Sequence, residues 1–282
     1  MHTPVLLKQV LSHIHNPPDT RYIDCTLGEG GHTLAIAQRG IRVLAIDADQ
    51  RQIDTFTKSH LSRSDALHIT VAQGNYADVA SIASHYRWIP SDGILFDFGL
   101  SMSQLKWEGG FSYKQLHQPL DMIIDTVAKQ RGATRAADVV GLYTEKELLK
   151  IFEHYGERIR AHEIAHAIGR ARREQKIETV GDLVRVVGQA TSQHDIPAVF
   201  QAIRMQVNNE RENITQGLLG ALKVVRSGGT IQVITFHSVE DRIVKLWARK
   251  HHLKKIAKYV GREVSREPFE QSAVLRVYKN TL

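Results

Sequence analysis

Short apolar runs alternate with amphipathic stretches over the first hundred residues of the chain. Runs typical of buried strands lie at residues 22–25, 43–46, 67–72 and 93–97. Two further runs of this kind, at 230–236 and 273–278, lie near the end of the chain. Strands that alternate with helices are typical of a doubly wound parallel sheet. The pattern therefore predicts an α/β fold built from both ends of the sequence.

Helix signals replace strand signals in the middle of the chain. A threonine followed three residues later by an acid, the spacing of a capping box, is found at 144–147 and 179–182. Gly156 is a helix stop after Tyr155. We expect an all-helical insert over residues 106–205, since few strand signals lie there.

The insert divides the remaining sequence into two segments of one domain, residues 1–105 and 206–282. Because the insert follows the fourth predicted strand, we expect it to recognise the substrate near the carboxyl ends of the strands, where open α/β sheets bind ligands. After the insert, the pattern predicts a helix over 217–226 that ends at the Ser-Gly-Gly of 227–229.

A glycine loop follows the first predicted strand, and Gly28, Gly30 and Gly31 have the spacing G-x-G-G. The next predicted strand ends in Asp47, whose carboxylate can accept both hydroxyls of a ribose. The spacing matches neither the dinucleotide motif G-x-G-x-x-G nor a P-loop with its lysine. We therefore expect a cofactor that has a ribose but no phosphate to bind, and S-adenosylmethionine fits that description.

The fourth predicted strand ends in Asp97, at the same edge of the sheet. Methylation of an exocyclic amine requires lone-pair density that ring conjugation withdraws, so a carboxylate that accepts the N–H bonds assists the reaction. Asp97 is the first candidate for this role or for cofactor binding, and a turn-capping acid is the structural alternative. His237, after the strand at 230–236, is the second candidate, to orient the base or receive a proton.

The segment after His237 has a helix start signal in Ser238 and Asp241, and we expect these two residues to cap a helix. Further upstream, Arg204 and Asn208 share the polar face of an amphipathic helix. This face could contact a flipped nucleotide or its phosphate, and a simple core helix is the alternative.

The charge distribution favours a nucleic-acid partner. The chain has a formal net charge of +7, and nine Lys or Arg lie between residues 242 and 266 against one acid, Glu263. A solubilising helix is the alternative interpretation. No apolar run reaches membrane-spanning length and the start has no secretory signal pattern, so we expect a cytoplasmic location. The single cysteine, Cys25, is expected to be a core residue.

Residues 162–166 spell H-E-x-x-H, the zinc motif of metalloproteases. Arginines lie on both sides of it, at 158, 160, 170, 172 and 173, and no third ligand is signalled. Because positive charge disfavours a dication, we expect no metal and interpret the segment as a basic helix.

These residues together resemble the RsmH (MraW) family of ribosomal RNA small subunit methyltransferases, along almost the whole chain. The matching blocks are residues 2–7, 30–32, 45–49, 97–101 with Gln104, 110–112 with 119–122, 155–157, 200–204 with 207–208, and 236–242. The chain departs from the family at Ile123, where arginine is usual, and at 102–103 and 267–273.

The resemblance implies a class I S-adenosylmethionine-dependent methyltransferase fold with an all-helical insert. It implies methylation of N4 of a cytidine in the decoding region of 16S ribosomal RNA, with that RNA or the small ribosomal subunit as partner. The implied cofactor contacts are Gly30, Gly31, His32, Asp47, Tyr76, Asp97 and Gln104, with Tyr76 against the adenine. The implied substrate contacts are Phe111, Asp121, Arg204 and Asn208.

Two other functions stay open on the sequence alone. A nicotinamide-dependent oxidoreductase could use the same glycine loop and ribose carboxylate, although the incomplete motif counts against it. A non-catalytic RNA-binding or ribosome-assembly protein could keep the fold, and Ile123 and the altered tail favour that alternative. A homodimer is also left open by the sequence.

Overall fold

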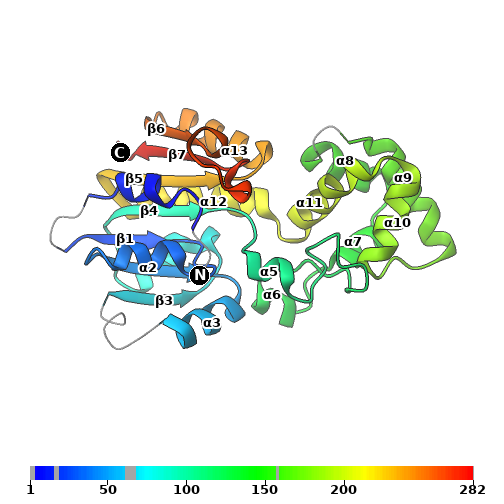
Figure 1. Ribbon diagram of the computed structural model, residues 1–282, viewed down its shortest axis with the longest axis horizontal. Coiled ribbons are helices and arrows are strands. Elements are labelled where there is room, and N and C mark those ends of the chain that lie inside the picture. The colour runs from blue at the N-terminus through cyan, green and yellow to red at the C-terminus, as the bar shows by residue number, and fades with distance from the viewer. Residues whose placement is uncertain (1–3, 16–18, 61–67, 157–158, 282) are drawn as a thin grey trace. The chain divides into compact units, whose positions relative to one another are not determined.

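The chain divides into two compact units. The computed structural model describes residues 4–15, 19–60, 68–156 and 159–281. Residues 1–100 and 211–282 form the first, here called the sheet unit, and residues 101–210 form the second, here called the helical unit. Figure 1 shows the strands in the first and only helices and loops in the second.

Seven strands of the described residues form one sheet, in the order β3-β2-β1-β4-β5-β7-β6. Their bounds are β1 Arg21–Asp24, β2 Arg42–Asp47, β3 Ile69–Gln73, β4 Ser91–Asp97, β5 Val225–Thr235, β6 Lys254–Val260 and β7 Val274–Lys279. β1 to β5 run parallel, whereas β7 pairs antiparallel with both β5 and β6. The sheet is therefore mixed, and the predicted parallel arrangement applies to its first five strands.

The hydrophobic pattern did not predict β6. Lysines at 254, 255 and 258 interrupt its apolar residues, and the strand forms the outer edge of the sheet (Figure 1). Lysine is common on such edges because it prevents pairing with other chains. The predicted end of the helix that precedes β5 was also wrong. This helix, α12 (Glu210–Val224), ends before the Ser-Gly-Gly segment, which lies within β5.

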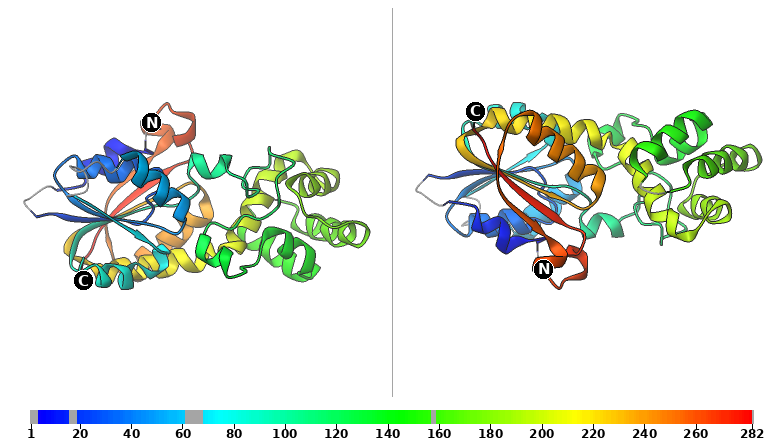
Figure 2. Two further views of the ribbon diagram at one scale, coloured as in Figure 1. Left: turned by 90° about the horizontal axis from the view of Figure 1, so that it is seen from below. Right: turned by 90° about the horizontal axis from the view of Figure 1, so that it is seen from above.

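Helices cover both faces of this sheet, as Figure 2 shows. One face is packed by α1 (Leu7–Ser12), α2 (Gly31–Ala37) and α3 (Gln50–His60), and the other by α4 (Val79–His85), α12 and α13 (Ser238–Lys250). A short helix, α14 (Gly261–Val264), and the 3-10 turns η2 (Tyr76–Asp78) and η4 (Pro268–Glu270) complete the unit. Alternate residues of the central strands enter the two cores: in β1, Ile23 lies in the core with α12 and Tyr22 in the core with α1.

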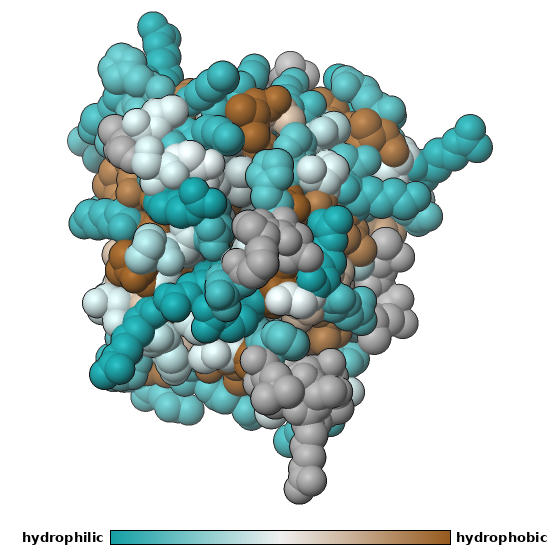
Figure 3. Space-filling model, turned by 90° about the vertical axis from the view of Figure 1, so that its left-hand side faces the viewer, coloured by the Kyte–Doolittle hydropathy of each residue, from teal (hydrophilic) through white to brown (hydrophobic). Residues whose placement is uncertain are grey.

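The strand order reverses at β1, which lies between β2 and β4. Open α/β sheets bind ligands outside the carboxyl ends of the strands at such a point. The opposite end of the sheet, with the amino ends of the parallel strands, faces the viewer in Figure 3, where hydrophilic side chains alternate with scattered apolar ones. The residues that follow β1, β2 and β4 therefore lie at the edge where a ligand is expected.

The helical unit contains no strand among its described residues. Its helices are α5 Met102–Lys106, α6 Thr126–Gln130, α7 Ala136–Leu142, α8 Glu145–Tyr155, α9 Ala161–Glu174, α10 Val180–Ala190, the 3-10 turn η3 Gln193–Asp195, and α11 Ile196–Val207. The predicted capping boxes at the starts of α8 and α10 are confirmed, as is the end of α8 before Gly156. Within the described ranges, no helix of either unit is both long and apolar enough to cross a bilayer.

Candidate active site

The glycine loop after β1 adopts a conformation that selects glycine. Gly28 and Gly30 have φ of +51° and +81°, in the left-handed region that other residues rarely adopt, and Gly30 directly precedes α2. A Cβ atom on Gly30 would collide with the ring of Phe56 from α3, and one on Gly31 would collide with Pro4. The loop therefore packs closely against side chains of its own unit where β1 ends.

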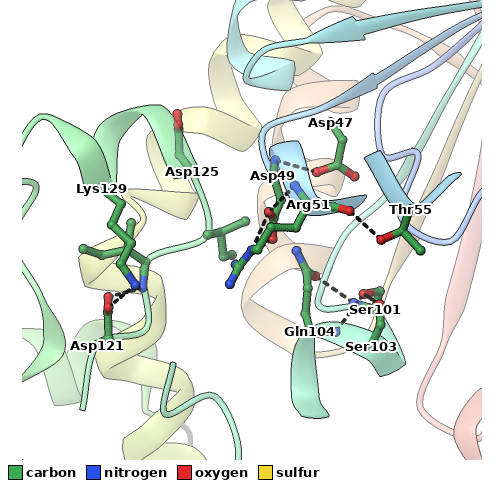
Figure 4. Close-up of polar contacts among 12 residues, drawn as sticks. Asp47, Asp49, Arg51, Thr55, Ser101, Ser103, Gln104, Asp121, Asp125 and Lys129 are labelled. Atoms are coloured by element: carbon green, nitrogen blue, oxygen red, sulfur yellow. Dashed lines mark hydrogen bonds and ion pairs between the residues drawn. The ribbon is translucent and has the colours of Figure 1, made fainter. Parts of the chain in front are cut away.

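Asp47 ends β2 beside this loop. Its Oδ2 accepts the backbone N–H of Gly28 at 2.8 Å, and its Oδ1 accepts that of Asp49 at 2.9 Å, the contact drawn in Figure 4. An ionised carboxylate has about four acceptor sites, so these bonds leave one on each oxygen for a pair of hydroxyls. Burial raises the pKa of Asp47 to about 7. The side chain is nevertheless partly exposed, as a ligand-binding carboxylate must be.

Asp24, at the end of β1, was missed by the sequence analysis. It is fully buried and accepts the hydroxyl of Thr33 at 2.7 Å and the backbone N–H of Thr26 at 3.1 Å. The Thr26 hydroxyl in turn accepts the backbone N–H of Asp97 at 2.8 Å. Burial raises the pKa of the Asp24 carboxyl. These bonds join the end of β4 to the end of β1. The feature that identified Asp47, an acid at the end of a strand, could also have identified Asp24.

His32 and Asp97 lie together at the switch point. His32 Nε2 is 3.6 Å from Asp97 Oδ2, and the imidazole is buried in the first turn of α2. Neither ring nitrogen of His32, nor Oδ1 of Asp97, has a hydrogen-bond partner among the described residues, although all three atoms are buried. Because buried polar atoms in proteins nearly always have partners, these atoms mark a place where the polar groups of a ligand fit.

Tyr76 lies in η2, after β3. Its ring packs edge-on to Phe96 at a centroid distance of 6.2 Å and tilts against Phe98 at 5.4 Å. Phe98, which the sequence pattern did not indicate as a site residue, follows Asp97 and completes an aromatic group at the end of β4. The contact of Tyr76 with adenine stays a prediction.

The capping prediction for α13 was wrong by one residue. His237 is the N-cap, and Glu240 accepts the backbone N–H groups of Phe236 at 2.8 Å and His237 at 3.4 Å. Asp241 instead forms an ion pair with Arg276 of β7 at 2.6 Å. Glu240 is fully buried, and its Oε1 lies 3.0 Å from Nε2 of His237. A buried carboxylate therefore lies against the imidazole of His237, the second candidate for chemistry.

Several predicted site residues belong to the helical unit, and some of them have simple local contacts. Gln104 completes a capping box at the start of α5, with its Oε1 accepting the backbone N–H of Ser101 at 3.0 Å (Figure 4). Asp121 is buried and pairs with Lys129 at 2.5 Å, also in Figure 4. Phe111, likewise from this unit, is buried.

Arg204 and Asn208 have strong partners within the helical unit. Arg204 forms a bidentate pair with Glu210, at 2.8 and 3.0 Å. The amide of Asn208 donates to Met122 O at 2.7 Å and accepts the backbone N–H of Ile124 at 2.8 Å. These contacts give both side chains a structural function, so their role in RNA binding stays a prediction with a competing explanation.

The H-E-x-x-H segment lies on α9 with both imidazoles exposed. His166 pairs with Glu145 of α8 at 3.3 Å, and Arg173 reaches the same carboxylate at 3.3 Å. In the part of the chain that the structure describes, no group of three His, Cys, Asp or Glu side chains could hold a metal ion. His166 thus belongs to a cluster of surface ion pairs. Cys25 is buried directly after β1.

Comparison with known proteins identifies the family. The model of the MraW methylase family matches residues 1–277. The chain belongs to the MraW methylase family. Among its relatives are the ribosomal RNA small subunit methyltransferases H of Thermomicrobium roseum, 39% identical over 88% of this chain and 77% of the relative, and of Fervidobacterium nodosum, 37% identical over 98% and 96%. The ribosomal RNA small subunit methyltransferase H of Persephonella marina is 36% identical over 99% of this chain and 98% of the relative.

Membership of this family makes the chain a methyltransferase whose cofactor is S-adenosylmethionine, and not the nicotinamide-dependent oxidoreductase or the non-catalytic protein considered above. The predicted class I methyltransferase fold is confirmed. The residues present fit the cofactor: Asp47 has acceptor sites for ribose hydroxyls, and the ring nitrogens of buried His32 have no hydrogen-bond partner among the described residues.

Proposed function

We propose that this methyltransferase transfers a methyl group to N4 of a cytidine in the decoding region of 16S ribosomal RNA. The observation that carries the proposal is Asp97, a carboxylate at the sheet's switch point whose Oδ1 is buried without a partner among the described residues. The names of the relatives supply the RNA class. The cytidine and its N4 atom follow from the resemblance and from the suitability of a carboxylate for an exocyclic amine.

The cofactor-binding residues of the proposal lie at or just after the ends of β1, β2 and β3, with one further residue, Gln104, in α5. Asp47 would accept the two ribose hydroxyls, and the backbone at Gly30 and Gly31 would contact the cofactor closely. The ring of Tyr76 would lie against the adenine, and the Gln104 side chain would add a polar contact. Bound S-adenosylmethionine supplies an electrophilic methyl group on a sulfonium.

Asp97 accepts an N–H of the cytosine amine and so directs the nitrogen lone pair toward the electrophile. The Thr26 hydroxyl accepts the backbone N–H of Asp97 at 2.8 Å, which fixes the position from which the carboxylate projects. His237, oriented by Glu240 at 3.0 Å, is the group we assign to orienting the base or receiving the released proton. A substrate-binding role for Phe111, Asp121, Arg204 and Asn208 is part of the same proposal.

The test is incubation of the protein with methyl-labelled S-adenosylmethionine and either 16S ribosomal RNA or 30S particles, followed by mapping of the labelled nucleotide. We expect label on N4 of one cytidine of the decoding region. Asp97→Asn is expected to lower turnover about 100-fold or more with cofactor affinity retained. Asp54→Asn, at an exposed carboxylate of α3, is the matched control. Label on another base, or wild-type turnover by Asp97→Asn, would refute the proposal.

A further inference from the structure

The segment between residues 242 and 266 has cationic side chains that the sheet unit leaves unneutralised. All nine of its Lys and Arg are exposed. Lys245 pairs with Asp241 at 3.2 Å, and the other eight form no ion pair with any residue that the structure describes. Cations of the helical unit, such as Arg135 and Arg185, do pair with neighbouring acids. We call the side chains of these nine residues the basic surface.

The orientation of α13 places part of the basic surface on one stripe. Trp247 packs edge-on to Tyr278 of β7 at a centroid distance of 6.0 Å, and Asp241 binds Arg276 at 2.6 Å. These contacts turn one side of α13 onto β7. The exposed opposite side presents residues at helical spacing, namely Arg242, Lys245 and Arg249.

The edge strand β6 extends this stripe. Lys255 lies opposite Tyr278 in the strand register, and Lys258 lies opposite Arg276. Opposed residues of an antiparallel pair share a face, so both lysines lie on the face of the sheet that α13 covers. The lysines therefore emerge beyond β7, next to the helix. α13 starts directly after His237, and at 1.5 Å per residue the stripe reaches Arg249 roughly 18 Å from there.

We infer that the basic surface binds the phosphate backbone of the RNA substrate and leads the strand toward His237. This inference rests on the proposed function for the class of nucleic acid. Phosphates complement eight cations that have no carboxylate partner among the described residues, and the release of their counterions favours binding. Leu246, 60% exposed within the α13 stripe, offers an apolar contact for a sugar or base. A second copy of this chain is disfavoured, because it would bring like charges together.

Protection of the sheet edge is the competing explanation for the lysines of β6. Both explanations are tested with a double variant, Lys255→Gln with Lys258→Gln. The control double variant is Lys58→Gln with Lys223→Gln, which removes the same charge from exposed positions on α3 and α12 of the same unit. Fluorescence anisotropy would report binding of a labelled transcript of the 16S decoding region without cofactor, at several KCl concentrations.

We expect the β6 variant to weaken RNA binding about 10- to 100-fold at 0.1 M salt and to reduce the salt slope by about 1.5 to 2. The control should bind like the wild type, and both variants should keep wild-type affinity for S-adenosylmethionine, which checks folding. Equal losses in both variants would show a net-charge effect and overturn the inference. Unchanged RNA affinity would overturn it as well, and oligomers of the β6 variant would then identify edge protection.

Methyl transfer by the wild type separates this inference from the proposed function. If the wild type methylates the RNA while the β6 variant binds RNA normally, the basic surface is wrongly assigned and the proposed reaction stands. If the β6 variant alone loses RNA binding but the wild type transfers no methyl group, the surface is correctly assigned and the proposed reaction fails.

Discussion

Replacement of Gly30 by alanine tests the structure of the cofactor loop against a matched control. Gly30 has φ of +81° and a Cβ atom there would collide with Phe56, whereas Gly40 has φ of +77° and open space around it. Both substitutions place alanine in the left-handed region, at roughly 1–2 kcal/mol, less about 0.4–1 kcal/mol gained by restricting the unfolded chain. Only Gly30→Ala adds overpacking, at about 1–3 kcal/mol.

We therefore expect the free energy of unfolding of Gly30→Ala to lie about 1–3 kcal/mol below that of Gly40→Ala. Urea denaturation of both variants with common m-values would measure the difference. Calorimetry should show weakened binding of S-adenosylmethionine for Gly30→Ala alone. If the two variants unfold at the same urea concentration, the Phe56 ring does not lie against the loop and the reasoning fails.

Two further predictions concern titration and positioning. Because burial raises the pKa of Asp47 to about 7, the protonated carboxyl favours the folded state, and this contribution to stability is lost as pH rises through that value. Cofactor binding instead needs the ionised carboxylate, so the affinity for S-adenosylmethionine should fall about tenfold from pH 8 to pH 6. Calorimetry on Asp47→Asn should show no such pH dependence, and a retained one would exclude Asp47 as its source. Glu240→Gln should lower methyl transfer about 10- to 100-fold through misplacement of His237, with cofactor affinity unchanged; equal rates would contradict that role.

The sequence predicted the carboxylates of the site better than their partners. The positions of Asp47 and Asp97 were predictable because the apolar run locates the end of each strand, and an acid follows each run at the edge of the parallel sheet. The α13 cap was not, because Ser238 with Asp241 and His237 with Glu240 have the same spacing one residue apart. Only the ion pair of Asp241 with Arg276, 35 residues away in sequence, decides between them.

The same limit applies to the helical unit and to the edge of the sheet. The helix pattern predicted an Arg204 side chain available for RNA, because its ion-pair partner, Glu210, lies beyond the break between α11 and α12. β6 was missed because its lysines follow no alternation of apolar and polar residues, and a bulge near Lys255 shifts its register. Contacts that cross a helix break or a register shift cannot be derived from periodicity, which describes one regular element at a time.

The central claim is that the carboxyl edge of the sheet binds S-adenosylmethionine through Asp47. Isothermal titration calorimetry at pH 8, where the Asp47 carboxyl is mostly ionised, compares Asp47→Ala and Asp54→Ala, two variants that lose nearly the same charge. Two hydrogen bonds to a charged group, at about 1.5–3 kcal/mol each, predict a loss of at least about 100-fold in affinity for Asp47→Ala and none for Asp54→Ala. Wild-type affinity in folded Asp47→Ala would contradict the account.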